Sequence, residues 1–261
     1  MHTIFSKAEE IRNSRQRAAI CIVIETRGST PRKQGSKMIV YEDGTIFGSI
    51  GGGSVEKEVA EKSLEVIALG KPVKCSFNLD IDLGMHCGGF MEVYIEPINP
   101  SQKLYIFGGG HIGKALIHFA QEFDFSITVF DPREGIFNDP VFTGCTCMEK
   151  DYFEAIDEAL FDDNTYIVIV TPKHIYDEDI LVKVVRKPHA YVGMIGSRRK
   201  VEQATKRFLD ENLLTAGEIE SIDMPMGIKF NAQTPQEIAI SILAKLIDVR
   251  NHMISPPYSP R

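Results

Sequence analysis

A glycine turn that follows a short apolar run constrains the fold of this chain more than any other feature. Residues 104–107 have the composition of a buried strand, and residues 108–113 continue with the sequence GGGHIG. In a dinucleotide-binding fold, the first glycine of such a turn allows a sharp bend, the second lets the backbone approach a pyrophosphate, and the third lets the helix pack close to its strand. Here these glycines are Gly108, Gly110 and Gly113. The segment therefore predicts a strand, a glycine turn and the start of a helix.

The residues after this turn favour a Rossmann-type unit. A second apolar run, residues 127–130, ends at Asp131, which lies about 20 residues past Gly108, as expected for a carboxylate that accepts ribose hydroxyls. Residues 165–170 and 190–195 are further apolar runs separated by helical patterns. Such runs are typical of parallel strands that are buried on both faces. The fold class predicted here is α/β, with a C-terminal Rossmann-type parallel sheet.

The N-terminal part has a different pattern, which predicts a smaller α+β domain. A helical pattern starts at Ile4, and five apolar runs follow at residues 18–25, 38–41, 45–47, 73–79 and 90–95. The sequence Glu42-Asp43-Gly44 between two of these runs is a hairpin signal. Prolines near residue 98 indicate a linker. The predicted boundaries are residues 1–97 for the N-terminal domain, 98–102 for the linker, 103–254 for the Rossmann-type domain and 255–261 for a disordered tail.

Composition argues against several classes of function. The net charge of −7 gives no general basis for binding nucleic acid. No run approaches the roughly 20 apolar residues of a membrane span, and the N-terminus has no apolar signal core, so we expect a cytoplasmic protein that does not bind membranes. Five irregularly spaced cysteines argue against a disulfide framework. Their spacing predicts no metal site, and Cys145 and Cys147 are expected to be structural or incidental thiols.

Two glycine-rich segments of the N-terminal domain are candidates for an anion site. Residues 26–37 form a basic, hydroxyl-rich loop, and three successive glycines precede a helix that Ser54 is expected to cap, with Glu56 near its positive end. Backbone N–H groups at a helix start attract anions. The alternative is that the glycines serve only a tight turn between strand and helix. The candidate cofactor-binding residues here are Arg32, Gly51, Gly52, Gly53 and Ser54.

Two further clusters follow predicted strands of the Rossmann-type domain, where ligands of open α/β sheets lie. His174 and Asp177 are candidate catalytic residues, and the alternative is that they cap a helix predicted to start at Asp177. The strand predicted at residues 190–195 is followed by a glycine, a serine and two arginines, which suit an anion. The alternative is that the arginines form the basic first turn of the next helix. This alternative is disfavoured because cations near a helix start oppose the helix dipole, so we expect the helix to start at Val201. The residues of this second cluster are Gly196, Ser197, Arg198 and Arg199.

Cys87 differs from a typical core cysteine. It lies beside His86 in a segment rich in glycine. Nearby cations or backbone N–H groups would favour the thiolate and make this cysteine reactive. A structural role is the alternative.

Seven short motifs, taken in chain order, resemble the signatures of the XdhC/CoxI family, the xanthine dehydrogenase accessory factors. They are Gly28-Ser-Thr-Pro-Arg32, Gly48-Ser-Ile-Gly-Gly-Gly-Ser-Val-Glu56, Cys87-Gly-Gly89, the GGGHIG turn, Thr171-Pro-Lys-His174 with Asp177, Gly196-Ser-Arg-Arg199 and Thr234-Pro-Gln-Glu-Ile-Ala239. The resemblance spans nearly the whole chain. One departure is Ser54, which stands where many CoxI-like members have a cysteine. Cys87 is therefore the stronger candidate thiol.

The resemblance implies an accessory protein, rather than an enzyme, that binds molybdenum cofactor. Such a protein assists sulfuration of the cofactor by a cysteine desulfurase and inserts it into a xanthine dehydrogenase-type molybdenum hydroxylase. It also implies a cytoplasmic homodimer with an N-terminal XdhC/CoxI-like domain, and Cys87 as a metal-end or sulfur-handling thiol. The sequence leaves open whether the pterin carries an added nucleotide.

The cofactor-binding residues expected in the Rossmann-type domain belong to its glycine turn, to the end of its second strand and to the GSRR segment. Two alternatives stay open. One is an NAD(P)-dependent oxidoreductase with His174 as its acid–base group, and the other is a nucleotide-binding sensor. The cofactor-binding residues that we expect in this domain are Gly108, Gly110, His111, Gly113, Asp131, Gly196, Ser197, Arg198 and Arg199.

Overall fold

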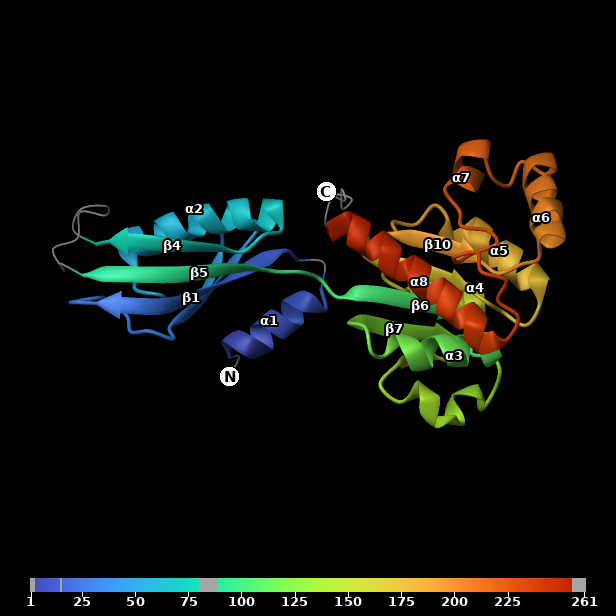
Figure 1. Cartoon of the computed structure of the whole chain (residues 1–261), viewed down its shortest axis with the longest axis horizontal. Helices are drawn as coiled ribbons and strands as arrows, with labels where there is room; N and C mark the ends of the chain where they lie inside the picture. Colours follow the sequence, from blue (N-terminus) through green and yellow to red (C-terminus); the bar gives the residue numbers. More distant parts are fainter. Residues whose placement is uncertain (1–2, 15, 80–88, 255–261) are drawn as a thin grey trace. The chain divides into compact units, whose positions relative to one another are not determined.

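The chain forms two compact units, Met1–Ser101 and Gln102–Arg261 (Figure 1). The structure is a computed structural model and describes residues 3–14, 16–79 and 89–254. Cys87 and the predicted tail lie outside the described residues. The last strand of the first unit ends at Ile98 and the first strand of the second begins at Gln102. Three residues, 99–101, therefore connect the two sheets.

The first unit is built on an antiparallel sheet of five strands in the order β3-β2-β1-β5-β4. Two helices accompany this sheet, one before its first strand and one after its third. The predicted hairpin turn joins β2 to β3. The elements are α1 (Ile4–Arg12), β1 (Ala18–Arg27), β2 (Lys37–Tyr41), β3 (Ile46–Gly48), α2 (Gly53–Leu69), β4 (Val73–Asn78) and β5 (Phe90–Ile98).

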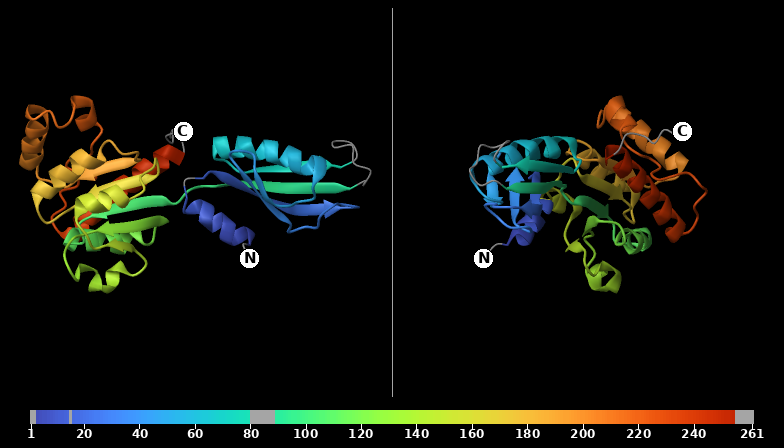
Figure 2. Two further views of the ribbon diagram at one scale, coloured as in Figure 1. Left: turned by 180° about the vertical axis from the view of Figure 1, so that it is seen from behind. Right: turned by 60° about the vertical axis from the view of Figure 1, so that its left-hand side comes forward.

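The two helices of the first unit cover opposite faces of its sheet. Successive side chains of a strand point to opposite faces. Ala19 and Cys21 of β1 accordingly pack in one core with α2, whereas Ala18 and Ile20 pack in another with α1 (Figure 2). Cys21 is fully buried, and burial raises the pKa of its thiol to about 11.

The start of α2 differs from the prediction. The helix begins at Gly53, so Ser54 lies inside its first turn and does not cap it. Gly52 is the N-cap residue, and its φ of 74° belongs to a region that favours glycine. Because glycine adopts this conformation at little cost, the chain enters the helix earlier than a serine cap would allow.

The second unit is an α/β unit around a parallel sheet of five strands in the order β10-β9-β6-β7-β8. The chain leaves β6 for β7 and β8 on one side and later adds β9 and β10 on the other side. This is the Rossmann-type arrangement that the sequence predicts, with the switch point between β6 and β9. The strands are β6 (Gln102–Phe107), β7 (Phe125–Phe130), β8 (Thr146–Met148), β9 (Thr165–Ile169) and β10 (Tyr191–Met194).

Helices cover both faces of this parallel sheet (Figures 1 and 2). Leu104 and Ile106 of β6 share one core with α3 and α8, and Tyr105 and Phe107 share the other with α4, α5 and α6. Burial on both faces explains why the strands read as continuous apolar runs. The helices are α3 (His111–Ala120), α4 (Tyr152–Glu158), α5 (His174–Val184), α6 (Arg198–Asp210), α7 (Ala216–Glu220) and α8 (Pro235–Ile254).

Local capping decides where several of these helices begin. Thr234 and Glu237 form a capping box at the start of α8, with Glu237 accepting from the amides of Gln233 and Thr234 at 2.7 and 3.0 Å. The predictions for α5 and α6 were wrong by three residues each. In α6 the hydroxyl of Ser197 caps the helix, so Arg198 is its first residue. An exposed cation near a helix start costs only about 0.3–1 kcal/mol, and the cap compensates for it.

In the described part of the chain, every helix is too short or too polar to cross a lipid bilayer.

Candidate functional site

The glycine turn lies at the carboxyl end of β6, beside β9. Gly108 has a φ of 116°, and a Cβ at this residue would come within 2.5 Å of the carbonyl oxygen of Val170. A Cβ at Gly113 would collide with the carbonyl oxygen of Gly108. The first glycine thus makes the turn and the third allows α3 to pack closely on β6, as predicted. Gly110 is the N-cap residue of α3, and His111, its first residue, is exposed.

Asp131, the residue after β7, is fixed to this turn. Its side chain is fully buried, and Oδ2 accepts from the backbone N–H of Gly109 at 2.8 Å. The guanidinium of Arg133 donates from Nε to Oδ1 at 2.8 Å and from Nη2 to Oδ2 at 2.6 Å. Burial would raise the pKa of Asp131, but the hydrogen bonds from Arg133 and Gly109 outweigh it and lower that pKa below its ordinary value. Asp131 is therefore an ionised carboxylate whose hydrogen-bond donors come from its own chain.

Asp177 holds the loop between β9 and α5. Its Oδ1 accepts from the backbone N–H of Thr171 at 2.9 Å and from the hydroxyl of Thr171 at 2.7 Å. These bonds agree with a local structural role, which the sequence left as the alternative to catalysis. The side chain of His174 lies outside the described part of the structure. A catalytic role for either residue stays a prediction.

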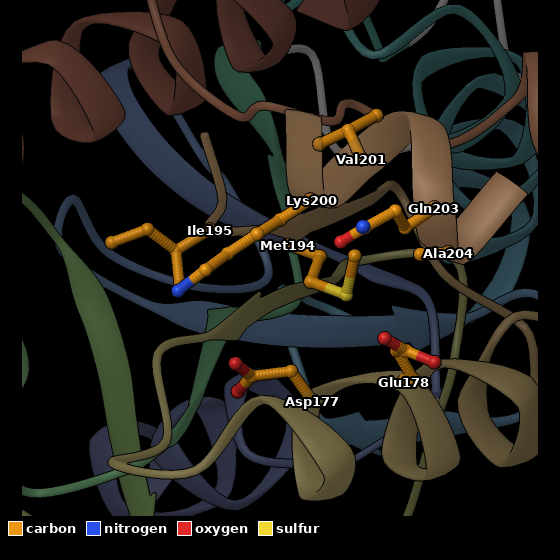
Figure 3. A pocket seen from close by; sticks show the side chains of 8 residues that line it. All are labelled: Asp177, Glu178, Met194, Ile195, Lys200, Val201, Gln203 and Ala204. Atoms are coloured by element: carbon orange, nitrogen blue, oxygen red, sulfur yellow. The ribbon is translucent and has the colours of Figure 1, made fainter. Parts of the chain in front are cut away.

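Asp177 also lines a pocket of about 210 Å3 at the carboxyl end of β10. In Figure 3, Asp177 and Glu178 point from α5 toward Lys200 and Gln203 on α6. Met194 forms part of the apolar lining. Acidic, basic and amide groups around an apolar wall suit a small polar ligand.

The GSRR segment contributes exposed cations near this pocket. Ser197 caps α6, and Arg198 and Arg199 are exposed in its first turn. Among the residues that the structure describes, neither arginine forms an ion pair. Both are accessible to an anion in solution, and their role in cofactor binding stays a prediction.

Three loops of the first unit meet at one end of its sheet. Pro31 of the basic loop packs against Gly51. A Cβ at Gly51 would come within 2.7 Å of Cγ of Pro31. Gly89 approaches the backbone of Ser29 so closely that a Cβ would collide with its carbonyl oxygen. Arg32 is exposed beside Gly51. The structure thereby brings together the GSTPR and GSIGGGSVE motifs and the last glycine of the CGG motif.

An internal carboxylate already occupies part of the triple-glycine turn. Glu56 accepts from the hydroxyl of Ser49 at 2.7 Å and from the amides of Ile50 and Gly51 at 3.1 and 3.2 Å. Burial would raise the pKa of Glu56, but these hydrogen bonds lower it overall. An anionic ligand at this turn would therefore use amides nearer the helix, at Gly53 and Ser54, or displace Glu56.

The other cysteines form no reactive cluster in the described part of the chain. Cys145 and Cys147 lie at the edge strand β8, half-buried and exposed respectively, and burial raises the pKa of both thiols. Within residues 3–14, 16–79 and 89–254, no three histidine, cysteine, aspartate or glutamate side chains are grouped as metal ligands would be.

Sequence reasoning missed three contributions to these sites. Arg133 follows Asp131 by two residues, and this spacing was the available signal for a pair at the end of β7. The hydrogen bonds from the amides of Ile50 and Gly51 to Glu56 were missed because Glu56 was interpreted only as favourable to the helix dipole. Gln203 reaches the pocket from the second turn of α6, and no motif in the sequence marks it.

Family models match both units. One, described as the XdhC Rossmann domain, matches residues 104–246, and another, described as the XdhC and CoxI family, matches residues 11–78. The chain belongs to the XdhC and CoxI family. The resemblance seen in the motifs is thereby confirmed.

Three relatives add context to this family membership. The uncharacterized protein YqeB of Escherichia coli (strain K12) is 34% identical over 255 residues, which are 95% of this chain and 46% of YqeB. A probable xanthine dehydrogenase subunit of Bacillus subtilis (strain 168) is 26% identical over 62% of this chain and 47% of its own length. The molybdenum cofactor insertion chaperone PaoD of E. coli (strain K12) is 30% identical over 39% of this chain and 33% of its own. The chain thus spans about half or less of the relatives it matches.

A solved structure supports the fold. The crystal structure of a xanthine dehydrogenase from Bacillus halodurans has a TM-score of 0.52 and 21% identity, and the match covers 99% of this chain and 98% of that one. At this identity the likeness concerns the fold alone.

Proposed function

We propose that this protein binds molybdenum cofactor as its cargo and serves as an accessory factor for a xanthine dehydrogenase-type molybdenum hydroxylase. The observation that carries the proposal is the family match over both units. Two relatives support it by name, one as a molybdenum cofactor insertion chaperone and one as a probable xanthine dehydrogenase subunit.

The residues of the chain fit such a cargo chemically. The cofactor carries a phosphate and an oxidised metal bound by a dithiolene, so it needs cations and backbone donors. Arg32 in the first unit and Arg198 and Arg199 in the second are exposed, and none of them forms an ion pair with another described residue. The pocket beside Asp177 offers a polar site of limited size for part of the pterin. Each unit therefore has groups that would hold an anionic ligand.

The finer parts of the proposal concern sulfur. A cysteine desulfurase would supply sulfur to the bound cofactor, and Cys87 would be the thiol nearest the metal. Ser54 supports this choice, because the chain lacks the cysteine that many CoxI-like proteins have there. The protein would act in the cytoplasm as a homodimer.

The first test is the molybdenum and pterin content of the protein after anaerobic purification from cells that make the cofactor. We expect near-stoichiometric amounts of both, and transfer of the cofactor to an apo hydroxylase. Protein that contains no pterin under these conditions, and that instead turns over a nicotinamide cofactor, would favour the oxidoreductase alternative.

Replacing Cys87 tests the sulfur step. We expect Cys87→Ser to lower the yield of active hydroxylase by about tenfold or more, as losses of groups around metal centres do. The matched control is Cys147→Ser, which removes an exposed thiol at β8 and should leave transfer unchanged. If Cys87→Ser loads and transfers cofactor like the wild type, Cys87 has no role in the reaction.

A further inference from the structure

Asp131 and Arg133 occupy the place where a dinucleotide fold holds the ribose of its ligand. Asp131 directly follows β7, next to the glycine turn after β6. In NAD-binding proteins, a carboxylate at this position accepts hydrogen bonds from the ribose hydroxyls. Whether the carboxylate of Asp131 is free to accept hydrogen bonds therefore decides which ligands the turn can bind.

The carboxylate of Asp131 is saturated by its own chain. A carboxylate has about four lone-pair positions. Asp131 accepts from the backbone N–H of Gly109 at 2.8 Å, and from the backbone N–H, Nε and Nη2 of Arg133 at 3.1, 2.8 and 2.6 Å. The side chain of Asp131 is 0% exposed. A ribose hydroxyl could bind it only by displacing Arg133.

Arg133 is accessible where Asp131 is not. Its side chain is 43% exposed, and the carboxylate takes two of the five N–H donors of its guanidinium. Nη2 lies 3.9 Å from the position that a Cβ of Gly110 would take, so the guanidinium stands beside the N-cap of α3. Burial and the neighbouring charge of Asp131 raise the pKa of the Tyr152 phenol, which is neutral at pH 7 as an ordinary tyrosine is. No second carboxylate contacts the guanidinium among the described residues.

We propose that Arg133 sets the ligand specificity of the glycine turn. It closes Asp131 to an unsubstituted ribose diol such as that of NAD, and it offers a guanidinium to a phosphate group in the same place. An arginine near this position is a known solution for a 2′-phosphate. The inference deepens the proposed function and rests on it only in treating the turn as a ligand site: the cargo would present a phosphate there.

NAD+ and NADP+ test this inference because they differ by one phosphate at the relevant ribose. Titration calorimetry on the full chain should show that the wild type binds NADP+ at least about tenfold more tightly than NAD+, the effect expected for hydrogen bonds to a charged group. Arg133→Ala should weaken the binding of NADP+, because it removes the cation. It should strengthen the binding of NAD+, because the carboxylate of Asp131 can then accept hydrogen bonds from the ribose. The ratio of the two affinities should therefore fall by about tenfold or more.

Two further variants make the result interpretable. Arg133→Lys keeps the charge but loses the two-donor fork, so the preference for NADP+ should be intermediate. Arg186→Ala removes an arginine just beyond the end of α5 that pairs with Glu218 of α7, away from the glycine turn, and should leave the ratio unchanged. Circular dichroism would check that each variant is folded.

Three outcomes would overturn the inference: equal affinity of the wild type for both nucleotides, binding of neither, or an unchanged ratio in both Arg133 variants. The proposed function fails separately, through the absence of molybdenum and pterin. The two failures are therefore distinguishable.

Discussion

In both glycine turns of this protein, backbone amides donate hydrogen bonds to a carboxylate, but the carboxylate comes from a different place in each. In the first unit, Glu56 folds back onto the amides of Ile50 and Gly51 from within the helix that follows the turn. In the second unit, Asp131 reaches the amide of Gly109 from the residue that follows the neighbouring strand β7. Each turn is thus held by a carboxylate whose pKa is lowered.

The difference between the turns lies in charge compensation. Asp131 is paired with the guanidinium of Arg133, whereas no cation pairs with Glu56 among the described residues. Asp131 is also fully buried, and Glu56 is only half-buried. A buried charge depends on its partners more strongly than a half-exposed one does. We therefore expect the second turn to be the more costly to disrupt.

The largest expected effect is that of Asp131→Ala. It leaves Arg133 and the N–H of Gly109 without their acceptor, so the free energy of unfolding of the second unit should fall by about 3 kcal/mol. Urea denaturation measures this change. The control Asp157→Ala removes an exposed partner of Lys183 and should cost less than about 1 kcal/mol. A loss for Asp131→Ala as small as that of the control would contradict a stabilising role for the pair.

A smaller effect is expected for Glu56→Gln. The amide keeps one acceptor oxygen but loses the charge that strengthens the bonds from Ser49 and Gly51, so the loss should be about 1 kcal/mol. Glu58→Gln, on the exposed side of the same helix, should change stability by less than about 0.5 kcal/mol. Equal effects of the two substitutions would mean that Glu56 acts only on the helix dipole.

The smallest effect should be the pH dependence of this difference. The pKa of Glu56 is lowered in the folded protein, so its contribution is fully present above the ordinary glutamate pKa of about 4.3. The contribution is lost as pH falls through the lower folded value. The stability gap between wild type and Glu56→Gln, followed by urea denaturation from pH 7 to pH 3, should therefore shrink on the acid side. A gap that widens there would show that folding raises the pKa of Glu56 instead.

Much of the fold could be predicted because its signals are local. Buried strands such as β9 read as apolar runs, and the capping box of α8 is encoded within four residues. The start of α6 was misplaced because the dipole argument was given more weight than the cap at Ser197.

The candidate sites were harder to predict because they depend on side-chain direction. Arg133 bends back to the residue two positions earlier, and Glu56 reaches amides five and six positions earlier. The pocket joins α5, β10 and α6, which meet only in the folded unit. Spacing in the sequence gives the positions of such residues but not the contacts they make.

The strand order of the first unit also bears on how the chain emerges from a ribosome. β1 lies in the middle of its sheet, between β2, which follows it closely, and β5, which ends at Ile98. The hairpin of β1 and β2 can form early, but the other edge of β1 stays bare until residues 90–98 have been synthesised. An unpaired strand edge is a template for association with other chains. During translation, the nascent first unit is therefore most in need of protection just before β5 appears.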